Sequence, residues 1–132
     1  MTPRSELTSI LALAALAALM AFVLTLRAEP APAQVGFPAR IQVVTTEFRL
    51  SMSRINVRTG LVRIELANYG EDPHDLKLRK IGTTKIYTIP ETAPGQRTSR
   101  TFKLPVGSYK VWCGIADHRA MGMRAPLKVV GR

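Results

Sequence analysis

The sequence predicts an all-β fold, a Greek-key β-sandwich or barrel of about eight strands, preceded by an N-terminal hydrophobic helix. Beyond residue 40 the chain consists of short runs in which apolar and polar residues alternate. Turn residues separate these runs at close intervals, and no run has the apolar period of an amphipathic helix. Such a series of short strands is typical of antiparallel sandwiches and barrels.

The first segment of the chain is apolar on every face of a helix. It carries no charge from Leu7 to Leu26, a run of twenty residues, which is roughly enough helix to cross a bilayer. We interpret residues 1–27 as a signal peptide or an uncleaved N-terminal membrane anchor, and the Ala-Pro-Ala pattern at residues 31–33 offers a processing site. Either interpretation places the rest of the chain in the periplasm or elsewhere outside the cytoplasm.

A Pro/Ala linker occupies residues 28–39, and residues 40–132 form the folded domain, which is long enough for one small core. The strands expected there, in chain order, are residues 40–50, 54–60, 61–70, 74–80, 85–89, 97–105, 107–113 and 125–130. Side chains alternate between the two faces of a strand, so Val62, Ile64 and Leu66 share one face and the charged residues between them take the other.

The same alternation predicts that two potential metal ligands face the core. His74, at the start of its strand, has the inward parity. In residues 107–113 the side chain of Lys110 must reach water, so Cys113 faces inward and Trp112 faces outward. A histidine and the only cysteine therefore stand at strand ends and point into the domain.

The chain is strongly basic, with a net charge of +10, and residues 34–132 carry 17 of its 19 lysines and arginines. This excess of positive charge favours binding to an acidic partner or to an anionic membrane surface. Nucleic acid is excluded, because the cations are spread along strands without a basic run and the domain is exported. The single cysteine rules out an intramolecular disulfide, and a lone thiol in an oxidising compartment calls for metal ligation, burial or intermolecular pairing.

Four side chains could together hold a metal ion. His74 is followed far along the chain by Cys113, His118 and Met123, with four residues between successive members of the last three. Two imidazoles, one thiolate and a weak thioether are the ligand set of a mononuclear blue-copper site. Each residue alone also has a plain structural explanation, since a buried cysteine often acts as a small hydrophobic group and a methionine as a filler of gaps.

Two segments resemble the cupredoxins, the family of small blue-copper proteins that includes plastocyanin, azurin and sulfocyanin. The segment GSYKVWCGIADHRAMGMRAPLKV is similar to their ligand loop, in which a strand leads into Cys, then His, then Gly-Met before the last strand. The segment LVRIELANYGEDPHDLKL is similar to the strand, turn and Pro-His that carry their other histidine. The resemblance covers residues 40–131 and implies a cupredoxin-like fold.

The resemblance also implies a role for each matching residue. His74, Cys113 and His118 match the three equatorial ligands of one type-1 copper ion, and Met123 matches the axial ligand. Met121 is the alternative axial ligand, although the glycine before Met123 favours the latter because it lets the chain turn sharply.

Around these ligands, the resemblance implies supporting and surface residues. Asp75 matches a side chain that follows the first ligand histidine and ties the two ligand loops together, although a solvated carboxylate explains Asp75 equally well. Asn68 is the candidate for an amide that lies near the thiolate and tunes it. His118, Trp112 and Met121 are the candidates for an electron-transfer surface, although Trp112 could simply pack on the exterior of the sheet.

The function implied is one-electron transfer on the outer side of the cytoplasmic membrane, by a monomer that is soluble or tethered and meets a redox protein with an acidic docking surface. We expect no enzyme activity, because two histidines are too few for a trinuclear copper cluster and one cysteine is too few for a binuclear centre. Two alternatives stay open: a copper-handling protein that delivers the ion to an oxidase, and a metal-free β-sandwich that serves as an interaction module.

Overall fold

The computed structural model describes residues 37–131. Among these residues no helix is long and apolar enough to span a membrane. The N-terminal helix predicted for residues 1–27, as signal peptide or anchor, lies outside the described residues, as does most of the linker.

The described chain is all-β, as predicted, with nine strands and no helix. Their bounds are β1 Ala39–Thr46, β2 Arg49–Met52, β3 Asn56–Arg58, β4 Gly60–Asn68, β5 His74–Lys80, β6 Ile86–Thr92, β7 Arg97–Leu104, β8 Gly107–Trp112 and β9 Arg124–Val130. The single strand predicted for residues 40–50 is wrong, because the chain reverses at Glu47 and Phe48 to make β1 and β2. Phe48 has a φ of 58°, the left-handed conformation that allows this tight reversal.

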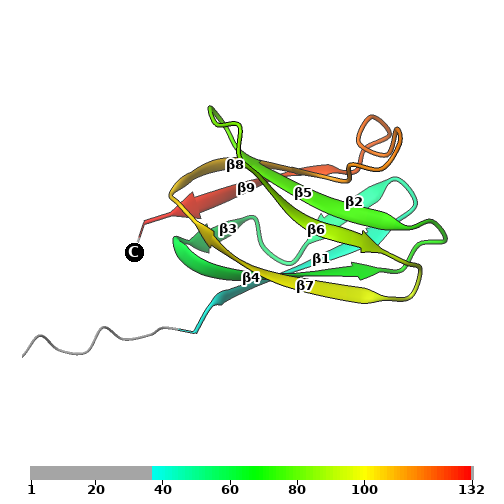
Figure 1. Cartoon of the computed structure of the whole chain (residues 1–132), viewed down its shortest axis with the longest axis horizontal. Coiled ribbons are helices and arrows are strands. Elements are labelled where there is room, and N and C mark those ends of the chain that lie inside the picture. Colours follow the sequence, from blue (N-terminus) through cyan, green and yellow to red (C-terminus); the bar gives the residue numbers. More distant parts are fainter. Residues whose placement is uncertain (1–36, 132) are drawn as a thin grey trace, which may run out of the picture. The chain divides into compact units, whose positions relative to one another are not determined.

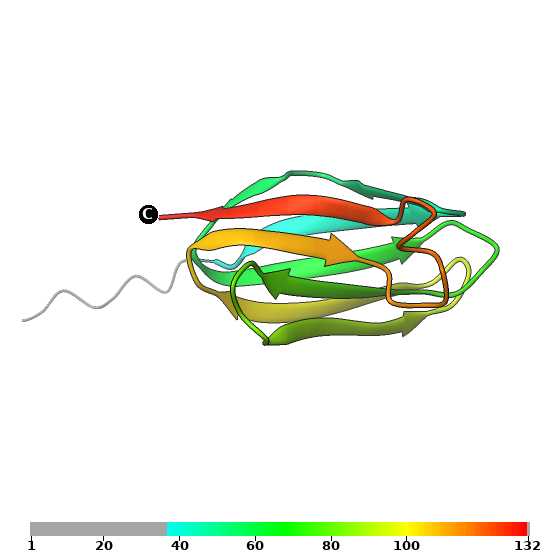
Figure 2. The same cartoon turned by 90° about the horizontal axis from the view of Figure 1, so that it is seen from above.

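The strands form two sheets that pack face to face (Figures 1 and 2). One has the order β2-β1-β4-β7 and the other the order β3-β9-β8-β5-β6. Most neighbours are antiparallel, but β1 pairs with β4, and β3 with β9, in parallel. The β1–β2 turn, the β4–β5 loop and the β8–β9 loop all lie at the end of the sandwich opposite to the C-terminus (Figure 1).

The core follows the predicted alternation along each strand. Val62, Ile64 and Leu66 of β4 are fully buried, whereas the exposed Arg63 between them lies on the outer face. Burying each such aliphatic side chain stabilises the fold by about 1.5–3 kcal/mol. The buried members of this core are Ile41, Val43, Val57, Val62, Ile64, Leu66, Leu76, Leu78, Ile89, Leu104, Tyr109, Val111, Leu127 and Val129.

Tyr109 is the largest of these buried side chains and carries a polar group into the core. Its hydroxyl donates a hydrogen bond of 2.8 Å to the backbone carbonyl of Pro105, which fixes the turn between β7 and β8. Burial raises the pKa of Tyr109, so the phenol stays protonated and remains a donor. This bond satisfies a buried polar group and also fixes the entry into β8, the strand that leads to Cys113.

We expect Tyr109→Phe to lower the free energy of unfolding by about 1 kcal/mol, because it removes this hydrogen bond while keeping the packing of the ring. Urea unfolding followed by circular dichroism measures the change. Tyr87→Phe is the matched control, since the Tyr87 hydroxyl lies 3.5 Å from the carbonyl of Lys103 at an exposed position. Equal losses in the two variants would contradict a structural role for the Tyr109 bond.

Candidate metal centre

Three predicted ligands meet at the end of the sandwich that carries the β4–β5 and β8–β9 loops. His74 is the first residue of β5, Cys113 directly follows β8, and His118 lies within the β8–β9 loop. Since β5 and β8 are antiparallel neighbours, the beginning of one lies beside the end of the other. Residues 39 positions apart in the chain, His74 and Cys113, thus become neighbours.

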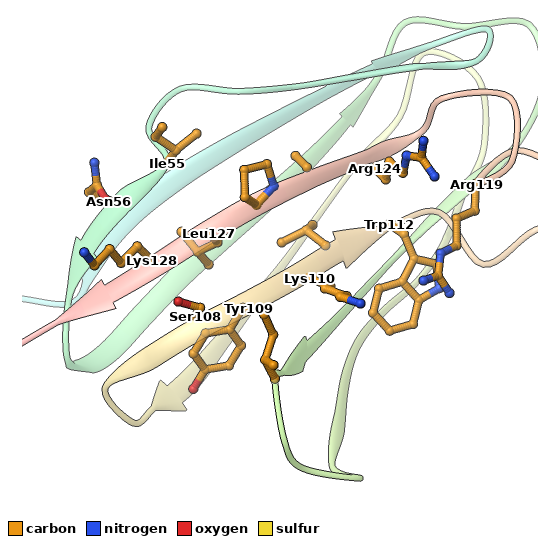
Figure 3. A pocket seen from close by; sticks show the side chains of 14 residues that line it. Ile55, Asn56, Ser108, Tyr109, Lys110, Trp112, Arg119, Arg124, Leu127 and Lys128 are labelled. Atoms are coloured by element: carbon orange, nitrogen blue, oxygen red, sulfur yellow. The ribbon is translucent and has the colours of Figure 1, made fainter.

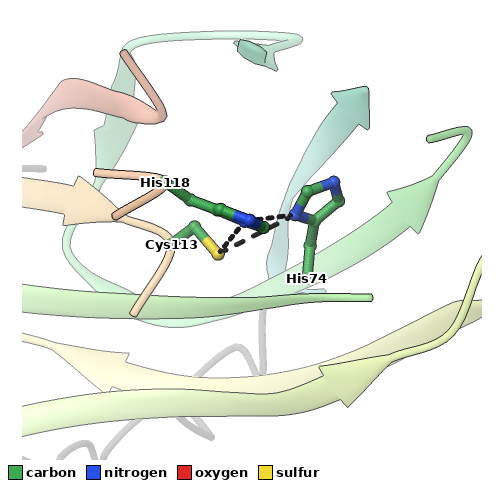
Figure 4. A group of neighbouring side chains, drawn as sticks. All are labelled: His74, Cys113 and His118. Carbon is green, nitrogen blue, oxygen red and sulfur yellow. Dashed lines mark hydrogen bonds between the residues drawn. The ribbon is translucent and has the colours of Figure 1, made fainter. Parts of the chain in front are cut away.

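The ligand atoms of the three side chains form a compact triangle (Figure 4). The Nδ1 atoms of His74 and His118 are 3.2 Å apart, and the Cys113 Sγ lies 3.9 Å and 3.8 Å from them, respectively. The point equidistant from these atoms lies about 2.1 Å from each, close to the bonds that a first-row metal such as zinc makes to imidazole and thiolate. The three side chains therefore fit one metal ion without rearrangement.

The triangle is shielded from water, which affects the protonation of His74 and Cys113. His74 and Cys113 are fully buried, and His118 is 7% exposed. Burial lowers the pKa of His74, and the nearby His118 lowers it further, so the His74 imidazole is neutral and can offer a lone pair. Burial raises the pKa of the Cys113 thiol, so a bound metal must displace its proton.

The two candidate axial methionines differ sharply in their surroundings. Met123 is fully buried, whereas Met121 is 48% exposed. The backbone of Met123 is bound to the middle and to the start of the ligand loop: its N–H donates to the carbonyl of His118 at 3.0 Å, and its carbonyl accepts from the N–H of Cys113 at 3.1 Å. Gly122 before it has a φ of 123°, a conformation that favours glycine and turns the chain inward at this point.

Asp75 connects the two ligand-bearing segments. It is 9% exposed, and its Oδ1 accepts a hydrogen bond from the backbone N–H of Gly114, the residue after Cys113. Its other oxygen lies 3.6 Å from the Lys77 Nζ. The alternative of a solvated outward carboxylate is therefore wrong, because the β5–β8 pairing brings Gly114 against it.

Asn68 shapes the loop that leads to His74. Its side chain is 1% exposed and donates hydrogen bonds to the carbonyls of Asp72 at 2.8 Å and Thr92 at 2.9 Å. Its Oδ1 accepts from the backbone N–H of Gly70 at 2.9 Å. Asn68 therefore holds the β4–β5 loop, including the approach to His74, without reaching the thiol itself.

Two residues of the β1–β2 turn belong to the site and were missed by the sequence analysis. The Glu47 carboxylate accepts hydrogen bonds from the backbone N–H groups of Glu71 and Asp72, and these bonds lower the pKa of Glu47. The Phe48 ring packs edge-on against the His118 ring at 5.6 Å between centroids. Both residues lie within the single strand predicted for residues 40–50, so the sequence does not indicate that they belong to the metal centre.

The indole of Trp112 is covered by neighbouring side chains. It lies on the outer face of β8, opposite to Cys113 in parity, yet it is only 8% exposed. The guanidinium of Arg119 lies 4.8 Å from the centre of its ring and that of Arg79 lies 6.0 Å away. Trp112 thus faces outward, as the alternation predicts, and these long side chains cover its indole.

No protein-family model matches the sequence, and no curated protein matches it either. Solved structures do match. Reduced auracyanin from the photosynthetic bacterium Roseiflexus castenholzii superposes with a TM-score of 0.60 at 19% identity, over 72% of this chain and 99% of its own. Auracyanin A, a blue copper protein from Chloroflexus aurantiacus, gives a TM-score of 0.57 at 16% identity, over 71% of this chain and 100% of its own.

A larger protein shares the same fold over part of its length. A multicopper oxidase superposes with a TM-score of 0.53 at 24% identity, over 70% of this chain but only 42% of the oxidase. The match to auracyanin spans nearly the whole of that protein, so the described residues correspond to a complete small domain. The described part of this chain has the cupredoxin fold, the β-sandwich of the small blue-copper proteins.

Proposed function

We propose that this protein is a type-1 copper protein that carries single electrons. The observation that carries this proposal is the buried triangle of His74 Nδ1, His118 Nδ1 and Cys113 Sγ at one end of a cupredoxin fold. When bound there, copper supplies a one-electron couple between its two oxidation states. Two imidazoles and a thiolate suit that couple, because thiolate favours Cu(I) and imidazole serves both states.

Met123 is the axial ligand in this proposal. Its full burial and its two backbone hydrogen bonds to the ligand loop support this assignment over the exposed Met121. The set of His74, Cys113, His118 and Met123 leaves no position for a substrate, which supports a carrier over an enzyme. With two histidines in the whole chain, the protein also cannot supply the additional copper ligands of an oxidase.

The exit route for the electron follows from the few exposed apolar side chains near His118. Met121 is 48% exposed and Phe48 is 41% exposed, and the Phe48 ring contacts His118 directly. These side chains support a contact surface through which the edge of His118 meets a redox partner. Trp112 adjoins Cys113 in the chain but is covered by Arg119, so it is accessible only to a partner that displaces or packs on that side chain.

The proposal includes a location outside the cytoplasm. The uncharged run of residues 7–26 supports export, either as a cleaved signal or as a tether on the outer side of the cytoplasmic membrane. We expect a monomer that reaches its redox partner in the periplasm.

The protein loaded with Cu(II) is expected to show an intense visible absorption band, because the Cys113 thiolate transfers charge to the metal. Cys113→Ser removes the thiolate and should abolish the band, with circular dichroism as the check that the fold persists. Ser keeps nearly the volume of the thiol, so loss of the band reports ligation.

Copper uptake by the parent protein without such a band would contradict the electron-carrier proposal. A delivery protein differs in a second way, since it should surrender Cu(I) readily to a competing chelator. Retention of Cu(I), together with reversible one-electron voltammetry, is the result expected for a carrier.

Separate substitution of the two methionines tests the axial ligand. Met123→Leu should raise the reduction potential, because loss of a thioether ligand destabilises Cu(II) more than Cu(I). Met121→Leu, the matched control on the surface, should leave the potential nearly unchanged. Protein-film voltammetry measures both, and the reverse order would assign the axial position to Met121.

Asp75→Asn tests the electrostatic contribution of the carboxylate beside Gly114. Asn retains an oxygen that can accept the Gly114 N–H but removes a negative charge that favours Cu(II). We expect the potential to rise by roughly 50–100 mV, the effect of one partly screened charge at an effective dielectric constant near 20. An unchanged potential, with an intact absorption band, would show that Lys77 already neutralises this charge.

A further inference from the structure

A groove of about 760 Å³ runs along the outer face of β8 and β9 (Figure 3). The outward residues of both strands form its floor, where Lys110 lies beside Pro126 and Trp112 beside Arg124 in the register of the pair. Two isoleucines border it at its edges: Ile55 is 52% exposed and Ile81 is 57% exposed. These side chains give the groove an apolar lining that is open to solvent.

The charges around this lining are all of one sign. Lys110, Arg119, Arg124 and Lys128 line the groove, and no aspartate or glutamate does. Within residues 37–131 the two ion pairs are those of Lys77 with Asp75 and of Arg97 with Glu65, so none of the four cations is paired in this part of the chain. We call this set of four cations and the lining between them the basic groove.

The carboxylates of the described chain are segregated from the basic groove. Five of the seven lie in or beside the turn and loops at the metal end: Glu47, Glu71, Asp72, Asp75 and Asp117. The basic groove therefore offers an acidic partner cations without carboxylates, whereas the end that carries His118 presents carboxylates as well. The net charge of the chain alone would not distinguish these two surfaces.

We propose that the basic groove is a docking surface for an acidic protein partner, separate from the His118 end of the domain. An apolar groove that is rimmed by arginine and lysine, with a tryptophan stacked beneath Arg119, has the composition of a protein interface, in which Trp and Arg contribute most to affinity. A partner that presents apolar side chains among carboxylates fits both the lining and the unpaired cations. The proposal deepens the proposed function, since it specifies the surface chemistry of the redox partner.

This surface is also connected to the metal ligands through the chain itself. Trp112 is covalently adjacent to Cys113, and Arg119, which stacks on Trp112, is adjacent to His118. A partner seated in the basic groove thus contacts the immediate chain neighbours of two ligands while leaving the His118 edge free.

The only tryptophan of the chain lies in the basic groove, so its fluorescence reports occupancy directly and without copper. The full chain, purified in a zwitterionic detergent, is titrated with a short peptide of alternating glutamate and leucine. We expect a saturable change in Trp112 emission that weakens as salt rises to physiological strength, where the Debye length falls to about 8 Å. The same peptide with lysine in place of glutamate should give no such change.

The double variant Lys110→Glu, Lys128→Glu should weaken binding of the acidic peptide at least about tenfold, because it reverses two charges of the rim. The control is Arg63→Glu, Lys103→Glu, which makes the same change of charge at exposed positions on β4 and β7 of the other sheet. This control should bind the peptide as the parent protein does.

Three results would overturn the proposal. Equal weakening in both double variants would mean that net charge alone attracts the peptide. Equal binding of the lysine peptide would mean that the groove does not select anions. A response to vesicles of anionic lipid without a response to the acidic peptide would assign the surface to a membrane. Because the protein is tested without copper, each of these results is independent of the absorption band on which the proposed function rests.

Discussion

The antiparallel register between β5 and β8 is the constraint on which the metal centre depends. Leu78 lies opposite Val111 in this pair, and both side chains are buried in the core. That register places the start of β5 beside the end of β8, so His74 and Cys113 meet. A slip of one residue would turn Cys113 to the outer face and bring Lys110 into the core, which the apolar packing does not allow.

Hydrogen bonds to the backbone hold the ligands in place before any metal arrives. Asp75 ties the first ligand segment to Gly114, Met123 closes the ligand loop onto Cys113, and Asn68 fixes the loop that precedes His74. A centre whose ligands are locked in this way changes little in geometry when its metal changes oxidation state, which suits electron transfer. The fold thus supplies rigidity, and the donor atoms supply the redox chemistry.

The same sandwich separates its charges between two surfaces. Carboxylates gather around the loops that carry the ligands, whereas Lys110, Arg124 and Lys128 project from the outer face of β8 and β9. Such a distribution acts mainly on how quickly and in which orientation a partner arrives. A redox partner therefore needs two different surface features. The proposed electron exit at His118 requires apolar contact, and the proposed docking in the basic groove requires negative charge.

Much of the fold and of the metal centre can be predicted from the sequence, because the alternation of side chains along a strand and the chemistry of donor atoms are local properties. They predict the all-β class, the inward Cys113, and the grouping of Cys113 with His118 in one short loop. The sequence does not predict three other features: the division of β1 from β2 at Phe48, the covering of Trp112 by Arg119, and the contact of Asp75 with Gly114. These features arise from contacts between segments distant in the chain, and only the pairing of strands in the folded domain determines which segments meet.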